Sequence, residues 1–349
     1  MTETPYLSID RERMERNITA MGHRAADLEL ALRPHVKTHK CIEIAELQMF
    51  SGATGLTVAT IGEAETFADA GFTDLFIAYP LWLSDEKAAR LSALAGRTRL
   101  RVGVDSAAGA RRLAEGLAGT PVEVLVEIDS GQHRTGVPPR EARAIAAAAV
   151  AAGLEVVGVF TFPGHGYGRG AARQKAAIDE SRTLVGAAAA LRHAGVTPRV
   201  ISGGSTPTAQ YADFSVLTEI RPGVYPFGDA QQLELGTCGF DDVALTAVST
   251  VVSRRRNRIV LDAGSKVIGA DRPAWASGFG RLLDHPDARI TALSEHHAVV
   301  DFPSGAALPE VGEVLRVIPN HVCTAVNLAD ELHLDDGQVW SVAARGANS

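Results

Sequence analysis

Short apolar runs alternate with Ala-rich, helix-forming stretches from about residue 14 to residue 235. The runs are rich in β-branched residues and lie at 56–59, 74–80, 99–104, 122–128, 154–160, 199–204 and 217–223. Several stretches between them end on a glycine, as helices commonly do. Strand–helix repeats at this spacing predict a parallel sheet with helical crossovers, and with segment 32–37 the strands number about eight. We therefore expect an α/β fold in which residues 14–235 form a (β/α)8 barrel of the TIM type.

The pattern changes after residue 235. Residues 236–349 contain short alternating segments separated by Gly, Pro and Asp turns, and none of them indicates a helix. This third of the chain is expected to form a small antiparallel β-domain. The apolar segment TPYLSI within residues 1–13 could add a strand to it.

Composition narrows the classes of function. Hydrophobic residues make up 46% of the 349 positions, and charged residues of both signs are mixed along the chain to a net charge of -7. Without a basic patch we expect no nucleic-acid partner. With no apolar run of about 18 residues and no signal-peptide core, we expect no membrane association and a cytoplasmic protein. The three cysteines, Cys41, Cys238 and Cys323, show no CxxC spacing and fit a reducing compartment.

Candidate chemistry begins in the segment Leu32-Arg33-Pro34-His35-Val36-Lys37-Thr38-His39-Lys40. So many polar groups are unusual in a barrel strand, and the active site of a barrel lies at the C-terminal ends of its strands. A lysine there, with its pKa lowered by burial and cationic neighbours, can bond covalently to a carbonyl group. A solvated basic loop and a patch for phosphate or acidic ligands are the alternatives.

RPHVKTHK resembles the signature of the D-threonine aldolase and eukaryotic-type D-serine dehydratase families, which are fold-type III pyridoxal phosphate enzymes of the alanine racemase class. The resemblance implies that Lys37 carries pyridoxal 5'-phosphate and acts as the catalytic base. Lys40 would then be a bystander or a charge neighbour. It also implies an alanine racemase-like fold, with the barrel followed by the β-domain.

Two further segments are candidates for contacts with the cofactor. The turn Ser202–Thr208 follows a predicted strand and is made of small and hydroxyl residues, which suits either a phosphate site or a merely tight loop. It is similar to the phosphate loop of the D-serine dehydratase branch, which implies roles for Gly203, Gly204, Ser205 and Thr206. The segment 127–137 resembles the DTGxxRxG stretch of alanine racemases, which implies that Arg134 contacts the phenolic oxygen. Alternatively Arg134 is a turn residue paired with Asp129.

The segment EIRPGVY at 219–225 is similar to a strand end of these families. The resemblance implies that Arg221 faces the pyridine nitrogen and that Tyr225 contacts the phosphate. An arginine there would keep the nitrogen unprotonated and weaken the ring as an electron sink. The segment FPGHGYG at 162–168 resembles a glycine–histidine element through which His165 or Tyr167 would touch cofactor or substrate, unless it is only a structural glycine-rich loop.

The β-domain contains Pro319-Asn320-His321-Val322-Cys323. If this segment is a strand, His321 and Cys323 point to the same face, and an imidazole with a thiolate suits zinc with positions left open. A chance pair is the alternative. The segment resembles the metal-binding PNHxC element of the dehydratase branch, whereas the aldolase branch has PxHxD. His296 and His297 are adjacent, so they would face opposite sides of a strand and are not expected to bind a metal together.

Together these resemblances imply a lyase that converts a D-β-hydroxy amino acid such as D-serine into a 2-oxo acid and ammonia, with metal-assisted departure of the hydroxyl group. Retro-aldol cleavage to glycine and an aldehyde, with His35 or His39 as base, is the alternative within the family. A non-catalytic pyridoxal phosphate carrier is an alternative of another class. The class also implies a homodimer. The residues do not distinguish D-serine, D-threonine and 3-hydroxy-D-aspartate as substrates.

Overall fold

The computed structural model describes residues 3–117 and 119–349. By their internal contacts these residues form two compact units. The barrel unit consists of Met21–Lys37, Ala45–Gly223 and Gly346–Ser349, and the β unit consists of the described residues up to Ala20, Thr38–Ile44 and Val224–Arg345. Helix α1 (Arg11–Asp27) begins in the β unit and ends in the barrel unit.

Eight parallel strands form the sheet of the barrel unit, in the order β2-β9-β8-β7-β6-β5-β4-β3. They are β2 (Ala31–Leu32), β3 (Leu56–Val58), β4 (Asp74–Pro80), β5 (Arg99–Val104), β6 (Glu123–Glu127), β7 (Glu155–Phe160), β8 (Val200–Gly203) and β9 (Glu219–Ile220). Parallel bridges from Leu32 to Ala53 and from His35 to Thr57 close the sheet beside β2 and β3. The barrel expected from the strand–helix alternation is confirmed.

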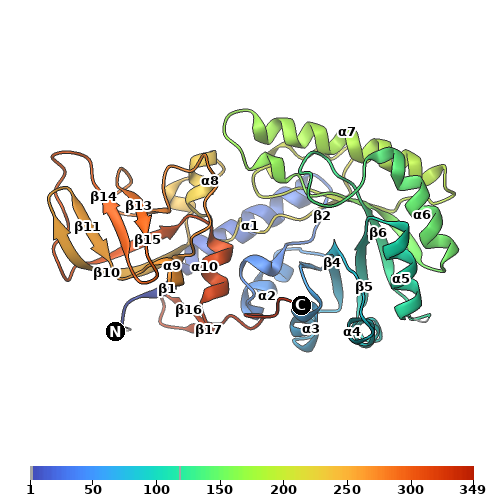
Figure 1. Cartoon of the computed structure of the whole chain (residues 1–349), viewed down its shortest axis with the longest axis horizontal. Coiled ribbons are helices and arrows are strands. Elements are labelled where there is room, and N and C mark those ends of the chain that lie inside the picture. Colours follow the sequence, from blue (N-terminus) through green and yellow to red (C-terminus); the bar gives the residue numbers. More distant parts are fainter. Residues whose placement is uncertain (1–2, 118) are drawn as a thin grey trace. The chain divides into compact units, whose positions relative to one another are not determined.

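Helices connect these strands and flank the sheet (Figure 1). They are α2 (Ile42–Phe50), α3 (Ile61–Asp69), α4 (Asp85–Ala95), α5 (Ala107–Leu117), α6 (Ala142–Ala151) and α7 (Ala172–Arg192). Local sequence fixes some of their starts, since the hydroxyl groups of Thr60 and Ser84 cap α3 and α4 by accepting backbone N–H bonds. The strands carry β-branched and apolar residues because they are covered by helices on the outside and by side chains within the barrel.

Buried charges occupy the N-terminal ends of the barrel strands. Glu219 accepts hydrogen bonds from Arg33 at 2.7 Å and from Arg101 at 3.1 Å, and Arg33 also pairs with Asp74 at 2.8 Å. Asp74 and Glu219 are the first residues of β4 and β9, so this network lies at the end of the barrel opposite the C-terminal strand ends. A charged network in this position contributes to the stability of a barrel rather than to its catalytic chemistry.

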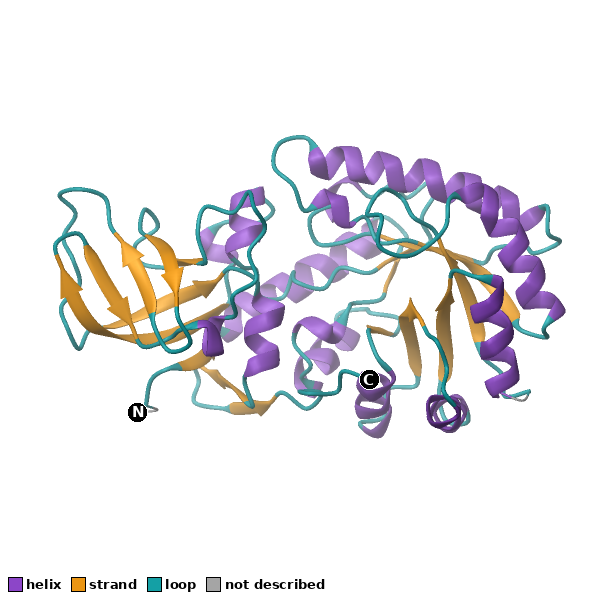
Figure 2. Cartoon of the chain, in the orientation of Figure 1, coloured by secondary structure: helices purple, strands orange, loops and turns teal. Residues whose placement is uncertain are grey.

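The β unit is built around a second sheet, in the order β13-β14-β11-β10-β1-β16-β17, with β15 paired to β10 and β12 (Figure 2). Its strands are β1 (Tyr6–Ile9), β10 (Leu245–Arg255), β11 (Arg258–Leu261), β12 (Gly280–Leu282), β13 (Arg289–Leu293), β14 (Ala298–Asp301), β15 (Val314–Pro319), β16 (Glu331–Leu334) and β17 (Val339–Ser341). All pairs are antiparallel except β1 with β16. The N-terminal strand therefore belongs to this sheet.

The β unit also contains three helices, of which α9 and α10 lie beyond residue 235, where the sequence indicated none. They are α8 (Ala230–Leu235), α9 (Ser265–Ile268) and α10 (Val322–Leu328). Helix α10 has the sequence VCTAVNL, whose β-branched residues disfavour a helix. Its first N–H group is bound at 3.2 Å by the buried carboxylate of Asp229, a residue far away in sequence. The expectation failed because a tertiary contact, and not local propensity, stabilises this helix.

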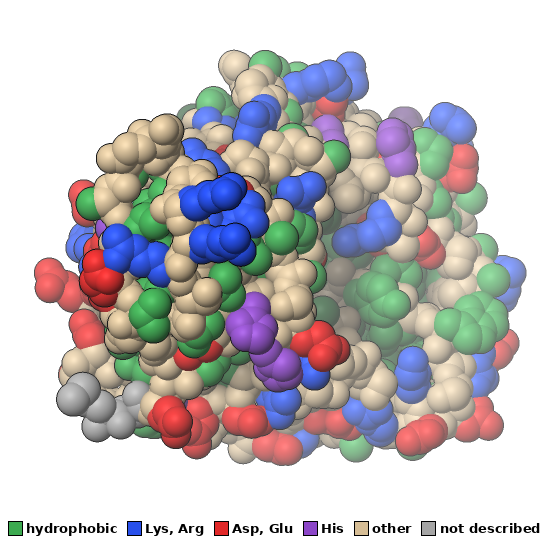
Figure 3. Space-filling model, turned by 60° about the vertical axis from the view of Figure 1, so that its left-hand side comes forward, with side chains coloured by type: hydrophobic (Ala, Val, Ile, Leu, Met, Phe, Trp, Pro, Cys, Tyr) green, Lys and Arg blue, Asp and Glu red, His purple; other side chains and the backbone are tan. Residues whose placement is uncertain are grey.

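The surface agrees with the mixed charge of the sequence. On the face drawn in Figure 3 both signs of charge are present, with several basic side chains close together in its upper part and most acidic ones along its lower part. In the described part of the chain, no helix combines the length and the apolar composition needed to cross a bilayer.

Candidate active site

Lys37 lies at the C-terminal end of the first barrel strand. Beyond β2 the chain continues between its neighbours, because the N–H of His35 donates to the carbonyl of Pro222 at 3.0 Å and the N–H of Thr57 donates to Pro34 at 2.8 Å. Lys37 follows in a 3-10 turn, Val36–Thr38, and is half-buried. Its Nζ lies 5.9 Å from the centroid of the Phe162 ring, which follows β7.

Three of the candidate residues lie around the ring of Phe162. The guanidinium carbon of Arg134 lies 5.4 Å from the centroid of the same ring, and the ring of Tyr167 lies 6.2 Å from it. The structure thus brings together Lys37, Arg134 and Tyr167, which come from three different loops. Phe162 was not singled out in the sequence, where nothing distinguishes it from an ordinary apolar residue.

The turn that carries Arg134 is organised by Asp129. This carboxylate accepts the N–H groups of Gly131 at 2.9 Å and His133 at 3.0 Å, and it contacts the imidazole of His133 at 2.7 Å. Burial acts to raise the pKa of Asp129, but these hydrogen bonds outweigh it and lower the pKa. Asp129 therefore pairs with His133 and not with Arg134, the alternative that the sequence left open. The Arg134 guanidinium lies over the Phe162 ring instead.

The glycine–histidine loop is closely packed. A Cβ atom on Gly131 would lie 3.0 Å from the ring of His165, and one on Gly166 would lie 2.8 Å from the methyl group of Thr208. The glycines thus have a steric role. Burial lowers the pKa of His165, although Asp179 at 3.6 Å opposes the shift, so His165 is neutral at pH 7.

The turn after β8 is bound internally. Gly204, at φ +77°, donates its N–H to Glu180 on α7 at 2.7 Å, and the N–H of Ser205 donates to the hydroxyl of Thr208 at 3.0 Å. These two N–H groups therefore do not form the exposed donor set expected from a glycine-rich turn. The hydroxyl groups of Ser205, Thr206 and Thr208 are its remaining polar side chains.

Arg221 follows β9 and lies inside the barrel. Its Nε donates to the hydroxyl of Ser202 at 2.9 Å, its Nη2 donates to the carbonyl of Thr161, and its guanidinium carbon lies 5.4 Å from the Phe160 ring centroid. Burial lowers its pKa, opposed by Glu219 and other carboxylates, and an arginine stays charged under such conditions. Its own N–H donates to Gly203 at 2.9 Å, so the structure brings Arg221 and the 203–206 turn together.

The remaining cofactor candidate, Tyr225, is a buried residue of the β unit. Two polar neighbours of Lys37 in the sequence also belong to this unit. His39 is fully buried, and its Nδ1 accepts the N–H of Cys41 at 3.1 Å. Lys40 donates to Asn327 on α10 at 2.7 Å. Both contacts are structural ones.

His321 and Cys323 do not share a strand, contrary to the sequence prediction. Strand β15 ends at Pro319, His321 is the N-cap of α10, and Cys323 lies in the first turn of that helix. Their side chains nevertheless interact, since burial acts to lower the pKa of His321 whereas Cys323 acts to raise it. The residues are close because a helix start brings them together, and not because of the two-residue period of a strand.

Two further side chains contact this pair, and neither was predicted. Asp229 Oδ2 lies 3.4 Å from His321 Nδ1, while its Oδ1 caps α8 by accepting the N–H of Gln232 at 2.8 Å. The thiol of Cys323 donates to the hydroxyl of Thr38 at 3.3 Å, and Thr38 is the residue after Lys37. The pattern Asp-Ala-Gln-Gln is a recognisable helix start, which signals the cap but not its contact with a histidine.

The pair fits a metal with open positions. Among residues 3–117 and 119–349, no group of three or more His, Cys, Asp or Glu side chains is arranged around one ion. A metal held by His321 and Cys323 alone would leave its remaining positions for water or substrate. Asp229 is placed as the carboxylate that orients a metal-binding imidazole. The other cysteines, Cys41 and Cys238, have a pKa raised by burial and are unsuited to bind a metal as thiolates.

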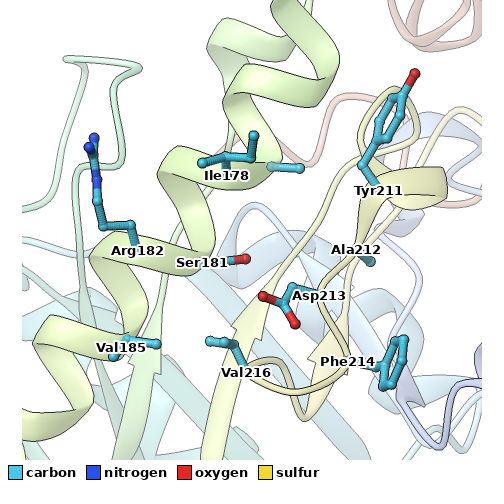
Figure 4. Close-up of a pocket in the computed structure, with 10 residues that line it drawn as sticks. Ile178, Ser181, Arg182, Val185, Tyr211, Ala212, Asp213, Phe214 and Val216 are labelled. Atoms are coloured by element: carbon cyan, nitrogen blue, oxygen red, sulfur yellow. The ribbon is translucent and has the colours of Figure 1, made fainter.

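A groove of about 640 Å³ lies elsewhere on the barrel unit, between α7 and residues 211–216 (Figure 4). Ile178, Val185 and Phe214 give it an apolar lining. None of the candidate residues named above lines it, so the groove is separate from the candidate site.

Comparison with known proteins identifies the family. Residues 9–231 match the model of the alanine racemase N-terminal domain, and residues 244–334 match that of the serine dehydratase domain. The chain is 35% identical over 347 residues to D-threo-3-hydroxyaspartate dehydratase from Delftia sp. HT23, covering 92% of this chain and 91% of the relative. It is 34% identical over 361 residues to D-threonine aldolase from Arthrobacter sp., covering 99% and 93%.

A solved structure of the Delftia dehydratase superposes with a TM-score of 0.89 at 34% identity, covering 98% of this chain and 97% of that one. Further solved structures of a D-threo-3-hydroxyaspartate dehydratase carry a histidine-to-alanine mutation and a cysteine-to-alanine mutation, the latter in the metal-free form. The chain belongs to the family of D-serine dehydratase, D-threo-3-hydroxyaspartate dehydratase and D-threonine aldolase, lyases with an alanine racemase-type N-terminal domain followed by a serine dehydratase-type domain.

Proposed function

We propose that this protein is a pyridoxal phosphate- and metal-dependent lyase that converts a D-configured β-hydroxy amino acid into a 2-oxo acid and ammonia. The observation that carries the proposal is the set of Lys37 and Arg134 around the Phe162 ring at the C-terminal strand ends of the barrel. An amine, a guanidinium group and an aromatic face suit an anionic aromatic aldehyde. The family relationship supports pyridoxal phosphate as that aldehyde.

The residues present fit this cofactor. Lys37 would bond to its aldehyde, Arg134 would lie beside its phenolic oxygen, and Arg221 would face its ring nitrogen. The hydroxyl groups of Ser205 and Thr206 would bind its phosphate at a turn kept narrow by Gly203 and Gly204. Tyr167 and Tyr225 are proposed as further contacts. When bound, the cofactor withdraws electrons from the amino acid and weakens the bonds at its Cα atom.

The side chains of the protein then have separate tasks. The amine of Lys37 takes the proton from Cα of the D-isomer. Arg221, fixed by Ser202 and Thr161, holds a positive charge that opposes protonation of the ring nitrogen. Neutral His165 can donate or accept one hydrogen bond near this loop without adding charge.

His321 and Cys323 are proposed to hold a divalent metal, most suitably zinc. Such an ion would act as a Lewis acid toward the β-hydroxyl group and make it a better leaving group. The metal-free structure of a D-threo-3-hydroxyaspartate dehydratase carries a mutated cysteine, and the mutated histidine and cysteine of that enzyme are two positions apart, as His321 and Cys323 are. This agreement in spacing supports the assignment of the two ligands.

We favour dehydration because the chain has Cys323 where the resembling aldolase element has an aspartate. The sequence Gly204-Ser205-Thr206-Pro207, which resembles the phosphate loop of the D-serine dehydratase branch, also favours it. Retro-aldol cleavage is the second candidate, supported by the 34% identity to a D-threonine aldolase. A non-catalytic carrier of the cofactor is disfavoured, since the likeness to lyases extends over the β unit, which carries the pair of His321 and Cys323.

The test is to incubate the purified, cofactor-loaded protein with D-serine, D-threonine and 3-hydroxy-D-aspartate, with and without a chelator. The proposal expects a 2-oxo acid and ammonia, no reaction of the L-isomers, and loss of activity with the chelator. Glycine and an aldehyde would instead establish the aldolase, and cofactor binding without turnover would establish a carrier. Sedimentation of the same preparation tests the proposed homodimer, and fractionation of the source cells tests the proposed cytoplasmic location.

A further inference from the structure

A buried carboxyl group on α7 contacts the turn assigned to the phosphate. Glu180 is 1% exposed and lies on the buried face of the helix with Ala176 and Leu184, one turn before and after it. Apolar residues normally occupy such positions, because burying a carboxyl group is destabilising unless it makes a specific contact. Glu180 therefore needs an explanation that the packing of α7 does not supply.

The contact is with the backbone of the turn. Glu180 Oε1 accepts the N–H of Gly204 at 2.7 Å. A Cβ atom on residue 203 would lie 2.4 Å from the same oxygen, so Gly203 has to be a glycine for Glu180 to reach the turn. On the other side, the carbonyl of Gly203 accepts the N–H of Arg221 at 2.9 Å. The turn is thus held by Glu180 from α7 and by Arg221 from the end of β9.

The charge of this carboxyl group depends on pH near neutrality. Burial raises the pKa of Glu180 to about 7, against the opposing effects of the Gly204 N–H and of Arg221. The Arg221 guanidinium is the charged group that acts on it. Below pH 7 the neutral carboxyl still accepts the N–H of Gly204 through its carbonyl oxygen. Above pH 7 it adds a negative charge beside a turn that would bind a dianion.

We propose that Glu180 is a positioning residue for cofactor binding, which fixes the backbone of the Gly203–Thr206 turn and admits the phosphate group best in its neutral form. This inference rests on the proposed function, because it requires that the turn binds the phosphate of the cofactor. Its chemistry is electrostatic and involves no covalent step.

The experiment compares two ligands that differ only in the phosphate. The affinity of the cofactor-free protein for pyridoxal 5'-phosphate and for pyridoxal is measured by absorbance titration between pH 6 and pH 8. The variants are Glu180→Ala, which removes the contact, and Glu180→Gln, which keeps the acceptor without the charge. Leu184→Ala, one turn along the same buried face, is the control for general loosening of α7.

Glu180→Ala should weaken binding of pyridoxal phosphate about tenfold, which is the loss expected when one hydrogen bond that fixes the turn is removed. It should weaken binding of pyridoxal less than about twofold. Leu184→Ala should leave the ratio of the two affinities unchanged. In the unsubstituted protein that ratio should fall about three- to tenfold from pH 6 to pH 8, as a negative charge appears near the phosphate. In Glu180→Gln the part of this fall caused by Glu180 should disappear. Any remaining pH dependence of the affinity ratio should then come from ionisation of the phosphate itself.

Equal losses for both ligands in Glu180→Ala, or the same loss of selectivity in Leu184→Ala, would overturn the inference. So would a Glu180→Gln protein with the pH dependence of the unsubstituted one. In these cases the unsubstituted protein still binds the cofactor, and the proposed function stands. Failure of the unsubstituted protein to bind pyridoxal phosphate would overturn both.

Discussion

Replacing Glu219 with glutamine should destabilise the barrel unit by about 3 kcal/mol. The carboxylate of Glu219 is 3% exposed and accepts hydrogen bonds from Arg33 at 2.7 Å and Arg101 at 3.1 Å. Breaking a buried ion pair on one side costs about 3–5 kcal/mol, because a buried charge is left without compensation. The lower end of this range applies here, since Arg33 keeps Asp74 and Arg101 keeps Glu123 as partners. The thermal midpoint should fall by about 6–12 °C.

The pH dependence of this loss has a definite sign. Burial acts to raise the pKa of Glu219, but Arg33 and Arg101 outweigh it and lower the pKa below the ordinary value of 4.5. A carboxyl group of this kind contributes stability above its pKa in the unfolded chain and loses it as the pH falls through its lower pKa in the folded protein. The difference between the two proteins should therefore be constant from about pH 6 to pH 8 and shrink below about pH 4.

Urea unfolding of the cofactor-free proteins, followed by circular dichroism at several pH values, measures both effects. The matched control is Glu155→Gln, at a surface pair with Arg199 at 2.7 Å, which should cost no more than about 0.5 kcal/mol. A loss below about 1 kcal/mol for Glu219→Gln at pH 7, or a difference that grows in acid, would refute the reasoning.

Three predictions concern the candidate site. Lys37→Ala should abolish capture of pyridoxal phosphate by borohydride reduction, whereas capture at another lysine, shown by peptide mapping, would contradict the assignment. Cys323→Ala should lower the zinc content of the protein and its affinity for zinc at least tenfold, measured by elemental analysis and chelator competition. The control Cys238→Ala should change neither quantity. Equal zinc content in the two variants would refute the assignment of His321 and Cys323 as the metal ligands. Arg134→Ala should raise the Kd for pyridoxal phosphate about tenfold, equivalent to about 1.4 kcal/mol. The control Arg140→Ala, at an exposed position of the next turn, should leave the Kd unchanged. An unchanged Kd for Arg134→Ala would show that Arg134 is not part of the site.

The barrel could be predicted from the sequence because its strands are buried and its helices are amphipathic, so each element shows its own period. The short strand β9 was found within the apolar run 217–223, whereas the strand predicted at 32–37 overlaps β2 only at Leu32, because Val36–Thr38 is a 3-10 turn. Helix α10 could not be predicted, since its start depends on Asp229, 93 positions earlier. The argument that placed His321 and Cys323 on one face of a strand was therefore wrong, although the two side chains do interact.

Of the residues that were missed, Glu180 left the clearest signal. Glu180 lies at helical spacing from Ala176 and Leu184, so a charged residue interrupts an otherwise apolar face. Such an interruption indicates a specific contact inside the protein. Phe162 left no signal, because its role comes from the loops that meet around it. Asp229 could be recognised as a cap, but its contact with His321 depends on tertiary structure.

The barrel keeps its ionic network and its candidate chemistry at opposite ends of the strands, and Ser202 is a bridge between them. Its hydroxyl donates to Glu219 at 2.7 Å and accepts from Arg221 at 2.9 Å. Laboratory evolution toward a new substrate should thus reject most replacements at position 202. A library that spares this serine would retain more folded members than one that includes it.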